Sequence, residues 1–371
     1  MIYLDHAATS RPKAPGVVEA MTAWYRELGV SAERGDSRLT RTVAGQVRET
    51  RERLGRLCGV PARQVAFGSG ATESINLFLR GFLARGDRVL TTQHEHSAVA
   101  RPLRALQRDL GIRVEVLPLE AGCDVMSDQV AAALAREPAR LLVFSHASNV
   151  TGRLLDAPAL TRVARAAGTA VLVDACQSAG IASLDFGADA VAASAHKSLL
   201  GPPGLGFLAV REGVPLRSAK QGGTGSSRAL DQHPESWPHV AEAGTPNTPA
   251  ILGLGAALAW GAGHDAAACG ARLLALLDQL ASELESLGAR IHSARTGARV
   301  PILSFTMPGL DPAEIGALLD DAGIHVRTGF HCAPWVHAAL GTEAAGVVRI
   351  SAGPFTAADE LRAPARALAR R

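Results

Sequence analysis

Residues 192–204 read AASAHKSLLGPPG, a run of small residues that ends in Lys197 and then breaks into glycines and prolines. Such a run followed by a Gly/Pro cluster is typical of a buried strand and the turn that ends it. The chain contains 38 basic residues, and only Lys13, Lys197 and Lys220 are lysines. A partly buried lysine at a strand end has a lowered pKa and a free amine for attack. Taken alone, the stretch also fits an ordinary lysine in a surface loop.

Strand-like runs of the same kind recur on both sides of this stretch, with helical patterns between them. Seven candidates lie between residues 60 and 210: 65–69, 88–93, 114–119, 141–147, 171–176, 190–195 and 206–210. Nearly continuous apolar strands that alternate with helices predict a mainly parallel sheet covered on both faces, and therefore an α/β fold. A long amphipathic helix at 271–288 and strands at 300–307 and 346–351 predict a second, smaller α/β domain.

Composition narrows the class of protein. The chain has 371 residues, 47% hydrophobic and 20% charged, which indicates a globular protein of more than one domain. A net charge of +3, without basic runs interleaved with aromatics, argues against nucleic-acid binding. We find no signal peptide, and the apolar segment 251–263 is too short for a membrane span. Five scattered cysteines without a CxxC pair argue against disulfides or structural zinc and suit a reducing cytoplasm.

Polar clusters follow several of the predicted strands, at the edge of a parallel sheet where ligands bind. Residues 68–73, GSGATE, combine glycines, a helix start and a hydroxyl, which suits a phosphate or simply caps a helix. Asp174 ends another strand, where it can pair with a cationic heterocycle or cap a turn. His94 and His96 alternate on a third, with no obvious further ligand for a metal. An aromatic ring here can instead stack on a planar cofactor.

The four clusters together indicate one cofactor. A phosphate cradle, a stacking ring, a carboxylate for a pyridinium nitrogen and an amine for an aldehyde are what pyridoxal 5'-phosphate requires. We therefore expect this cofactor, and no metal.

Nine motifs in order then carry a family resemblance: YLDHAATS (3–10), GSGATESIN (68–76), EHSAV (95–99), SNVTG (148–152), VDACQSAG (173–180), SAHKSLLGPPG (194–204), AGTPNT (243–248), RTGFHCAP (327–334) and VRIS (348–351). The chain resembles the fold-type I pyridoxal-phosphate enzymes of the class V aminotransferase and cysteine desulfurase family, in the branch with an R-T-G-x-H-C-A loop. The resemblance implies a large cofactor-binding domain at 16–255 built on a mainly parallel seven-stranded sheet. It implies a small C-terminal domain at 256–371 that carries the cysteine loop. Residues 1–15 would pack with the small domain.

The resemblance also implies a role for each cofactor-binding residue. Lys197 would form the Schiff base, and Asp174 would keep the pyridinium nitrogen protonated. Gln177 would bind the phenolate oxygen, while His96 would stack on the ring and shuttle protons. Thr245 would reach the phosphate in the neighbouring subunit, so that a homodimer completes the site. The phosphate would also be held by Ala71, Thr72, Ser194 and His196.

Cys332 distinguishes this family from other users of the cofactor. It lies in a turn-rich loop beside basic groups, which favour the reactive thiolate. The family's thiol at this place accepts sulfur from the substrate, whose carboxylate Asn149 and Arg349 would bind, with Arg327 as a further substrate-binding residue. The remaining cysteines are expected to be structural: Cys58, Cys123, Cys176 and Cys269.

Three departures from the family pattern concern the surroundings of the site. His6 stands where asparagine is usual. The stretch 32–38, which includes Ser37, lacks a histidine common near the site and leaves the preferred substrate open. Phe330 replaces a frequent second histidine, which makes the loop more apolar and removes a cation near the thiol.

The expected function is L-cysteine desulfuration, which leaves a persulfide on Cys332 and releases L-alanine, with sulfur passing to an acceptor protein. Selenocysteine lyase and cysteine sulfinate desulfinase activities share the site and stay open. A pyridoxal-phosphate aminotransferase or epimerase is a wider alternative, and a non-catalytic sulfur-relay protein is a third.

Overall fold

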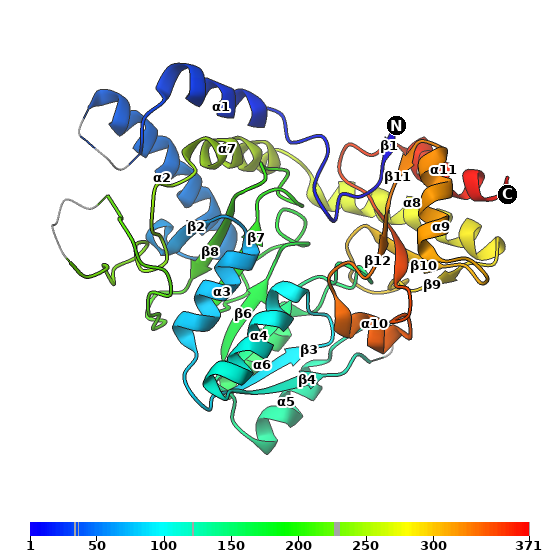
Figure 1. Cartoon of the computed structure of the whole chain (residues 1–371), viewed down its shortest axis with the longest axis horizontal. Coiled ribbons are helices and arrows are strands. Elements are labelled where there is room, and N and C mark those ends of the chain that lie inside the picture. Colours follow the sequence, from blue (N-terminus) through cyan, green and yellow to red (C-terminus); the bar gives the residue numbers. More distant parts are fainter. Residues whose placement is uncertain (33–34, 36, 121, 226–230, 371) are drawn as a thin grey trace.

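The computed structural model describes residues 1–32, 35, 37–120, 122–225 and 231–370. The described residues form a seven-stranded, a four-stranded and a two-stranded sheet, and Figure 1 shows the first two next to each other, a larger and a smaller one. The larger has the order β2-β8-β7-β6-β5-β3-β4, and only β8 runs antiparallel to its neighbours. The predicted seven-stranded, mainly parallel sheet is therefore confirmed. Its strands are β2 (Val65–Gly68), β3 (Arg88–Thr92), β4 (Arg113–Leu117), β5 (Leu141–Ser145), β6 (Ala170–Asp174), β7 (Ala190–Ser194) and β8 (Gly206–Val210).

Helices cover both faces of this sheet, which is why its central strands β5, β6, β7 and β8 are mostly apolar. Val171 and Val173 of β6 pack into one apolar layer, and Leu172 between them packs into the opposite layer. The first layer includes α2 (Arg38–Cys58), α5 (Ser127–Arg136), α6 (Ala157–Ala166) and α7 (Thr248–Ala262), and the second includes α3 (Ala71–Phe82) and α4 (Ser97–Leu110). Because both faces are covered, the polar clusters lie beyond the carboxyl ends of the strands.

The smaller sheet has the order β12-β13-β10-β9 and is antiparallel. Side chains of α8 (Ala266–Ser286), α9 (Pro312–Asp321) and α11 (Ala358–Leu368) form one apolar cluster with it. Its strands are β9 (Arg290–Ile291), β10 (Ile302–Thr306), β12 (Arg327–Gly329) and β13 (Val347–Ser351). A separate short helix, α10 (Pro334–Leu340), follows the cysteine loop.

The N-terminal segment lies on the smaller sheet's side of the molecule. Strand β1 (Ile2–Tyr3) pairs in parallel with β11 (Ile324–His325), and Leu4 packs in the α8–α9–α11 cluster. The domain boundaries stay predictions, and the one at 255/256 falls inside the continuous helix α7, which packs on α1 (Val17–Ala23) and α2. Across the described part of the chain, each helix is too short or too polar to cross a bilayer.

Candidate active site

Most of the predicted site residues meet around one cavity of about 240 Å³ between the two sheets. The larger sheet contributes residues at or after the carboxyl ends of its strands, and the smaller sheet contributes β12 and β13. Because neighbouring parallel strands end at the same edge, Asp174 at the end of β6 and Lys197 after β7 face a shared space. The predicted residues lining the cavity are Ala71, Thr72, His96, Asn149, Asp174, Ser194, His196, Lys197, Arg327 and Arg349.

One end of the cavity is built from the start of α3. The Ala71 amide donates to Ser194 Oγ at 2.9 Å, which joins the helix start to the end of β7. A Cβ on Gly206 would lie 2.6 Å from the Gly70 backbone, so β8 passes too close for any other residue. Thr72 is exposed at the same place. The start of this helix, together with the hydroxyls of Thr72 and Ser194, forms a donor set suited to a phosphate.

Lys13 is a residue that the sequence reasoning did not assign. Its ammonium donates to Thr9 Oγ1 and Ser10 Oγ, each at 3.1 Å, and to the His196 carbonyl at 3.2 Å. Burial lowers the pKa of Lys13 to about 8. The scarcity of lysine in the chain was a signal that could have drawn attention to it. Lys13 therefore fixes the N-terminal segment against the residue that precedes Lys197.

His96 is held in one orientation as the N-cap of α4. Its Nδ1 accepts the Ala98 amide hydrogen at 3.0 Å, so in the neutral ring Nε2 carries the hydrogen. Burial, and next the charge of Lys197, lowers the pKa of His96 to about 4, which keeps the imidazole neutral at pH 7. His94 lies elsewhere, with Nε2 2.7 Å from the Cys123 carbonyl. Among the described residues, no cluster of three metal-ligating side chains occurs.

Asp174 has a buried carboxylate that accepts the Cys176 amide hydrogen at 2.9 Å. Behind it, Glu95 is fully buried and accepts hydrogen bonds from Thr92 Oγ1 at 2.6 Å and Ser145 Oγ at 2.9 Å. Burial raises the pKa of Glu95 to about 8, so this carboxyl is mostly protonated at pH 7. The negative charge at this edge of the sheet is therefore concentrated on Asp174, facing the cavity.

Arg349 forms the opposite end of the cavity. Its Nη2 donates to Asp5 Oδ1 at 2.6 Å and its Nη1 to the Asn149 carbonyl at 3.0 Å. The guanidinium is 1% exposed, and its Nε–H has no partner among the described residues. Asn149 in turn donates to the His331 carbonyl at 2.7 Å. Asp5 thus fixes the arginine that faces the cavity, while Nε stays available for a carboxylate.

His331 also lines the cavity, and the sequence reasoning gave it no role. Its Nε2 donates to the Val347 carbonyl at 3.2 Å, and its buried Nδ1 has no partner in the described part of the chain. Burial, together with Arg349 and Arg327, lowers the pKa of His331 to about 2. His331 is therefore a neutral hydrogen-bond acceptor among cations.

Cys332 lies outside the cavity lining and is exposed. Its sulfur is 3.9 Å from Arg327 Nη2, and Arg327 does line the cavity. The Cys332 carbonyl accepts the Ser97 amide hydrogen at 2.7 Å, which holds the loop to the start of α4. His331 and Cys332 both have left-handed backbones, with φ of 47° and 58°. Two such non-glycine residues in succession are strained, and strain of this kind gathers at functional loops.

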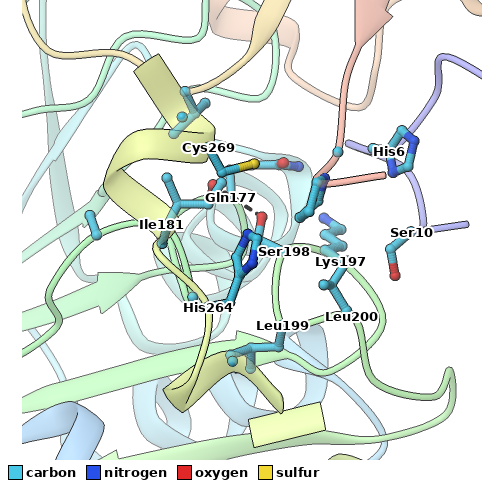
Figure 2. A pocket seen from close by; sticks show the side chains of 18 of the residues that line it. His6, Ser10, Gln177, Ile181, Lys197, Ser198, Leu199, Leu200, His264 and Cys269 are labelled. Atoms are coloured by element: carbon cyan, nitrogen blue, oxygen red, sulfur yellow. Dashed lines mark hydrogen bonds between the residues drawn. The ribbon is translucent and has the colours of Figure 1, made fainter. Parts of the chain in front are cut away.

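Two other expectations, for Gln177 and Thr245, have different outcomes. Gln177 does not line the 240 Å³ cavity; it donates to the Ala7 carbonyl at 2.9 Å and lines a second cavity of about 550 Å³, which Lys197 also borders. Figure 2 shows Gln177 and Lys197 in that cavity together with His264 and Cys269. Thr245 is exposed and lines neither cavity.

Two of the departures also have a place in the structure. His6 is buried against Gly353, where a Cβ would lie 2.4 Å from its ring. In the stretch 32–38, residues 33, 34 and 36 lie outside the described residues.

Comparisons with known proteins agree with this arrangement. Residues 2–363 match the model of the family described as aminotransferase class-V. The chain is 34% identical to a probable cysteine desulfurase of Pseudomonas putida, over 97% of this chain and 91% of that protein. It is 31% identical to a probable cysteine desulfurase of Methanothermobacter thermautotrophicus, over 97% and 92%.

Solved structures give the same result. An apo cysteine desulfurase from Thermococcus onnurineus superposes with a TM-score of 0.93 at 29% identity, over 100% of this chain and 94% of that one. The cysteine desulfurase CsdA (S-sulfonic acid) from Escherichia coli superposes with a TM-score of 0.89 at 29% identity, again over 100% and 94%.

Proposed function

The chain belongs to the class-V aminotransferase family, and from this membership we propose that it is a pyridoxal-phosphate-dependent L-cysteine desulfurase. The observation that carries the proposal is the link made by Arg327. This side chain lines the cavity of Lys197 and lies 3.9 Å from the exposed thiol of Cys332. Arg327 thus connects the amine expected to bind the cofactor aldehyde, Lys197, with the thiol expected to accept the substrate sulfur, Cys332.

The donor set around the cavity fits pyridoxal 5'-phosphate. The α3 start with Thr72, Ser194 and the neighbouring His196 suits the phosphate, and Asp174 suits a protonated ring nitrogen. His96 offers a neutral ring of fixed orientation at the same cavity. When bound, the cofactor supplies an electron sink for the bonds around the substrate's α-carbon.

Each surrounding residue then has a task of its own. Lys197 Nζ removes the α-proton of the substrate, since it is the amine that faces the cavity. Nε–H of Arg349 receives the substrate carboxylate, with Asn149 beside it. His96 orients the cofactor ring with its imidazole, whose Nε2 carries the hydrogen. The imidazole remains uncharged, because its pKa of about 4 lies far below neutral pH.

The sulfur step belongs to Cys332. Its thiolate attacks the sulfur of the substrate cysteine, a new S–S bond forms and the substrate's C–S bond breaks. The electron pair of that bond stays with the carbon part, which takes up protons and leaves as L-alanine. The sum is L-cysteine plus enzyme thiol giving L-alanine plus enzyme persulfide, without an added oxidant or reductant. Arg327 supports the thiolate as the nearby cation.

We also propose that the enzyme works as a homodimer with a shared site and that a sulfur-acceptor protein takes the persulfide sulfur. Thr245 supports the dimer, because it is exposed and lies outside the lining of its own cavity, as expected for a residue that contacts the neighbouring subunit.

The test is mass spectrometry of the holoenzyme after incubation with L-cysteine, combined with alanine detection. We expect an added sulfur atom on Cys332 and alanine formed in equal amount. Cys332→Ala should keep the yellow cofactor and lose sulfur release from cysteine. Unchanged release from cysteine by that variant would contradict the proposal. Turnover of selenocysteine or cysteine sulfinate that exceeds turnover of cysteine would favour the lyase or desulfinase alternatives.

A further inference from the structure

The second cavity, of about 550 Å³, is more than twice the size of the 240 Å³ cavity, and Lys197 borders both. It is lined by faces of α2, α7 and α8, by the turns that follow β6 and β7, and by the chain next to β10 and β13. Protein interiors contain few voids larger than a water molecule, whereas pockets for small molecules measure about 300–1,000 Å³. Its size therefore indicates a binding site.

The walls of the second cavity are largely apolar. The rings of Trp260 and His264 stack with their centres 4.5 Å apart and form a flat aromatic wall. Leu199 and Leu273 are buried side chains of the same lining, and Figure 2 shows Leu199 next to the cavity. A Cβ added to Gly270 of α8 would meet nothing within 4 Å, so this helix leaves the space open. A planar apolar body suits such walls.

Several polar residues of the lining are already hydrogen-bonded within the chain. Ser198 Oγ donates to the Gln177 carbonyl at 3.2 Å, and the Gln177 side-chain amide donates to the Ala7 carbonyl at 2.9 Å. Ser10 Oγ donates to the His196 carbonyl at 3.1 Å. Because these donors have partners, this part of the cavity makes little demand for polar groups on a ligand.

The charge of the lining is of one sign. Among the described residues that line the second cavity there is no aspartate or glutamate, while Arg53, Arg56 and Lys197 are cationic. Arg53 is paired with Glu49 at 2.7 Å. Arg56 is exposed and has no ion-pair partner in the described part of the chain. A guanidinium without a partner, beside an apolar space, suits a carboxylate.

We propose that the second cavity binds a planar apolar carboxylate, with its rings beside Trp260 and its carboxylate at Arg56. The site is separate from the one proposed for the amino acid, whose carboxylate goes to Arg349 in the 240 Å³ cavity. Because Lys197 borders both cavities, the ligand lies beside the residue that the cofactor requires. The inference goes beyond the proposed function and does not depend on it, since binding is measured without turnover.

The experiment is calorimetric titration of the holoenzyme with 2-naphthoate and with 2-naphthamide, which has the same shape but no charge. We expect naphthoate to bind about tenfold more tightly than the amide at low salt, and the difference to shrink as salt is added. Arg56→Gln should remove the difference by weakening naphthoate alone. The matched control is Arg162→Gln, the same change at an exposed arginine on α6, a helix that contributes nothing to this lining.

A side chain placed at Gly270 locates the bound probe. Gly270→Leu fills the open space and should abolish binding of both naphthoate and naphthamide. Gly45→Leu, also within a helix and outside both cavities, should leave binding unchanged. Turnover of cysteine in the absence of probe should be the same in Gly270→Leu as in the wild type, which shows that the fold and the 240 Å³ cavity are intact.

Cys269 allows the same test on the unaltered chain. Its half-buried thiol lines the second cavity, whereas Cys332 lies outside this lining. Saturating naphthoate should slow the reaction of N-ethylmaleimide with Cys269 several-fold and leave Cys332 unchanged, as followed by mass spectrometry of each site.

Equal affinity for naphthoate and naphthamide, or no protection of Cys269, would overturn the proposal. Naphthoate binding that persists in Gly270→Leu would also overturn it, since the probe would then occupy another site such as the one at Arg349. These outcomes are separable from those of the proposed function. An enzyme that forms a persulfide from L-cysteine but fails these binding tests would retain the desulfurase and lose the second site, and the converse result would do the opposite.

Discussion

Arg327 Nη2 lies 3.9 Å from the sulfur of Cys332, while the same guanidinium lines the cavity of Lys197. The arginine thus stands between a nucleophile on the surface and the place where substrate is held. A cation at this distance favours the thiolate form of a cysteine. The Arg327 guanidinium can therefore interact with the Cys332 thiolate before sulfur transfer and with the substrate in the cavity.

We expect Arg327→Gln to slow the alkylation of Cys332, because the thiolate loses its nearby positive charge. The reaction with iodoacetamide at neutral pH should be several-fold slower in this variant than in the wild type, and the difference should shrink as salt is added. Arg327→Lys keeps the charge and should keep most of the reactivity. Equal alkylation rates in the wild type and Arg327→Gln would show that the contact does not affect the reactivity of the thiol.

Arg349 and Asp5 form a buried ion pair whose loss should affect folding as well as activity. Arg349→Gln leaves the Asp5 carboxylate buried without its cation, and we expect a loss of about 3–5 kcal/mol in unfolding free energy. Asp5→Asn combined with Arg349→Gln removes both charges and should recover much of that stability without recovering activity. Denaturant unfolding and cysteine turnover of the three variants separate the two roles. Recovery of turnover in the double variant would exclude Arg349 from substrate binding.

His94 should make the protein less stable in mild acid. Burial lowers the pKa of His94 from its ordinary 6.5 to about 4, so the folded state favours the neutral imidazole. The stabilisation is complete above pH 6.5 and is lost as pH falls toward 4, because the unfolded chain takes up the proton first. Lowering the pH from 7 to 5 should reduce the unfolding free energy by about 2 kcal/mol through this residue.

His94→Gln isolates this effect from that of the other buried histidines. The glutamine amide can still donate to the Cys123 carbonyl, but it does not titrate. Urea unfolding at pH 7 and pH 5 should therefore show a smaller acid loss in this variant than in the wild type. Equal losses would mean that His94 does not carry the difference.

Gly206 and Gly45 offer a matched pair of glycine substitutions. A Cβ on Gly206 would lie 2.6 Å from the Gly70 backbone, so Gly206→Ala should push the start of α3 away from β8. We expect about 1–3 kcal/mol of destabilisation and weaker retention of the cofactor. Gly45 lies within α2, and the atom nearest to its added Cβ is 4.0 Å away. Gly45→Ala should stabilise by about 0.5–1 kcal/mol and leave cofactor retention unchanged, as measured by thermal unfolding and dialysis.

Much of this architecture could be predicted from residue patterns. The seven strands of the larger sheet were all expected from their apolar runs. A strand that is buried on both faces gives a nearly continuous apolar run, which is easy to recognise in a sequence. The edge at which Asp174 and Lys197 meet follows from the parallel pairing of β6 and β7. Ten of the thirteen predicted site residues line one cavity, and two of them, Arg327 and Arg349, come from the antiparallel smaller sheet.

The remaining features depend on contacts between distant segments, which local patterns do not encode. His331 Nδ1, which has no partner among the described residues, depends on a turn with two left-handed residues in succession. The protonated state expected for Glu95 depends on its complete burial behind Asp174. The three hydrogen bonds of Lys13 depend on how the N-terminal segment crosses the His196 backbone.

The pairing of Asp5 with Arg349 bridges a separation of 344 residues and therefore has a consequence for biosynthesis. On the ribosome, the larger sheet is completed by β8 at Val210, long before β13 is translated. Until β13 emerges, Asp5 lacks its cation and the end of the cavity that we propose for the amino acid is missing. A nascent chain can thus gather its cofactor-facing residues early, yet it acquires the means to process an amino acid only as translation nears its end.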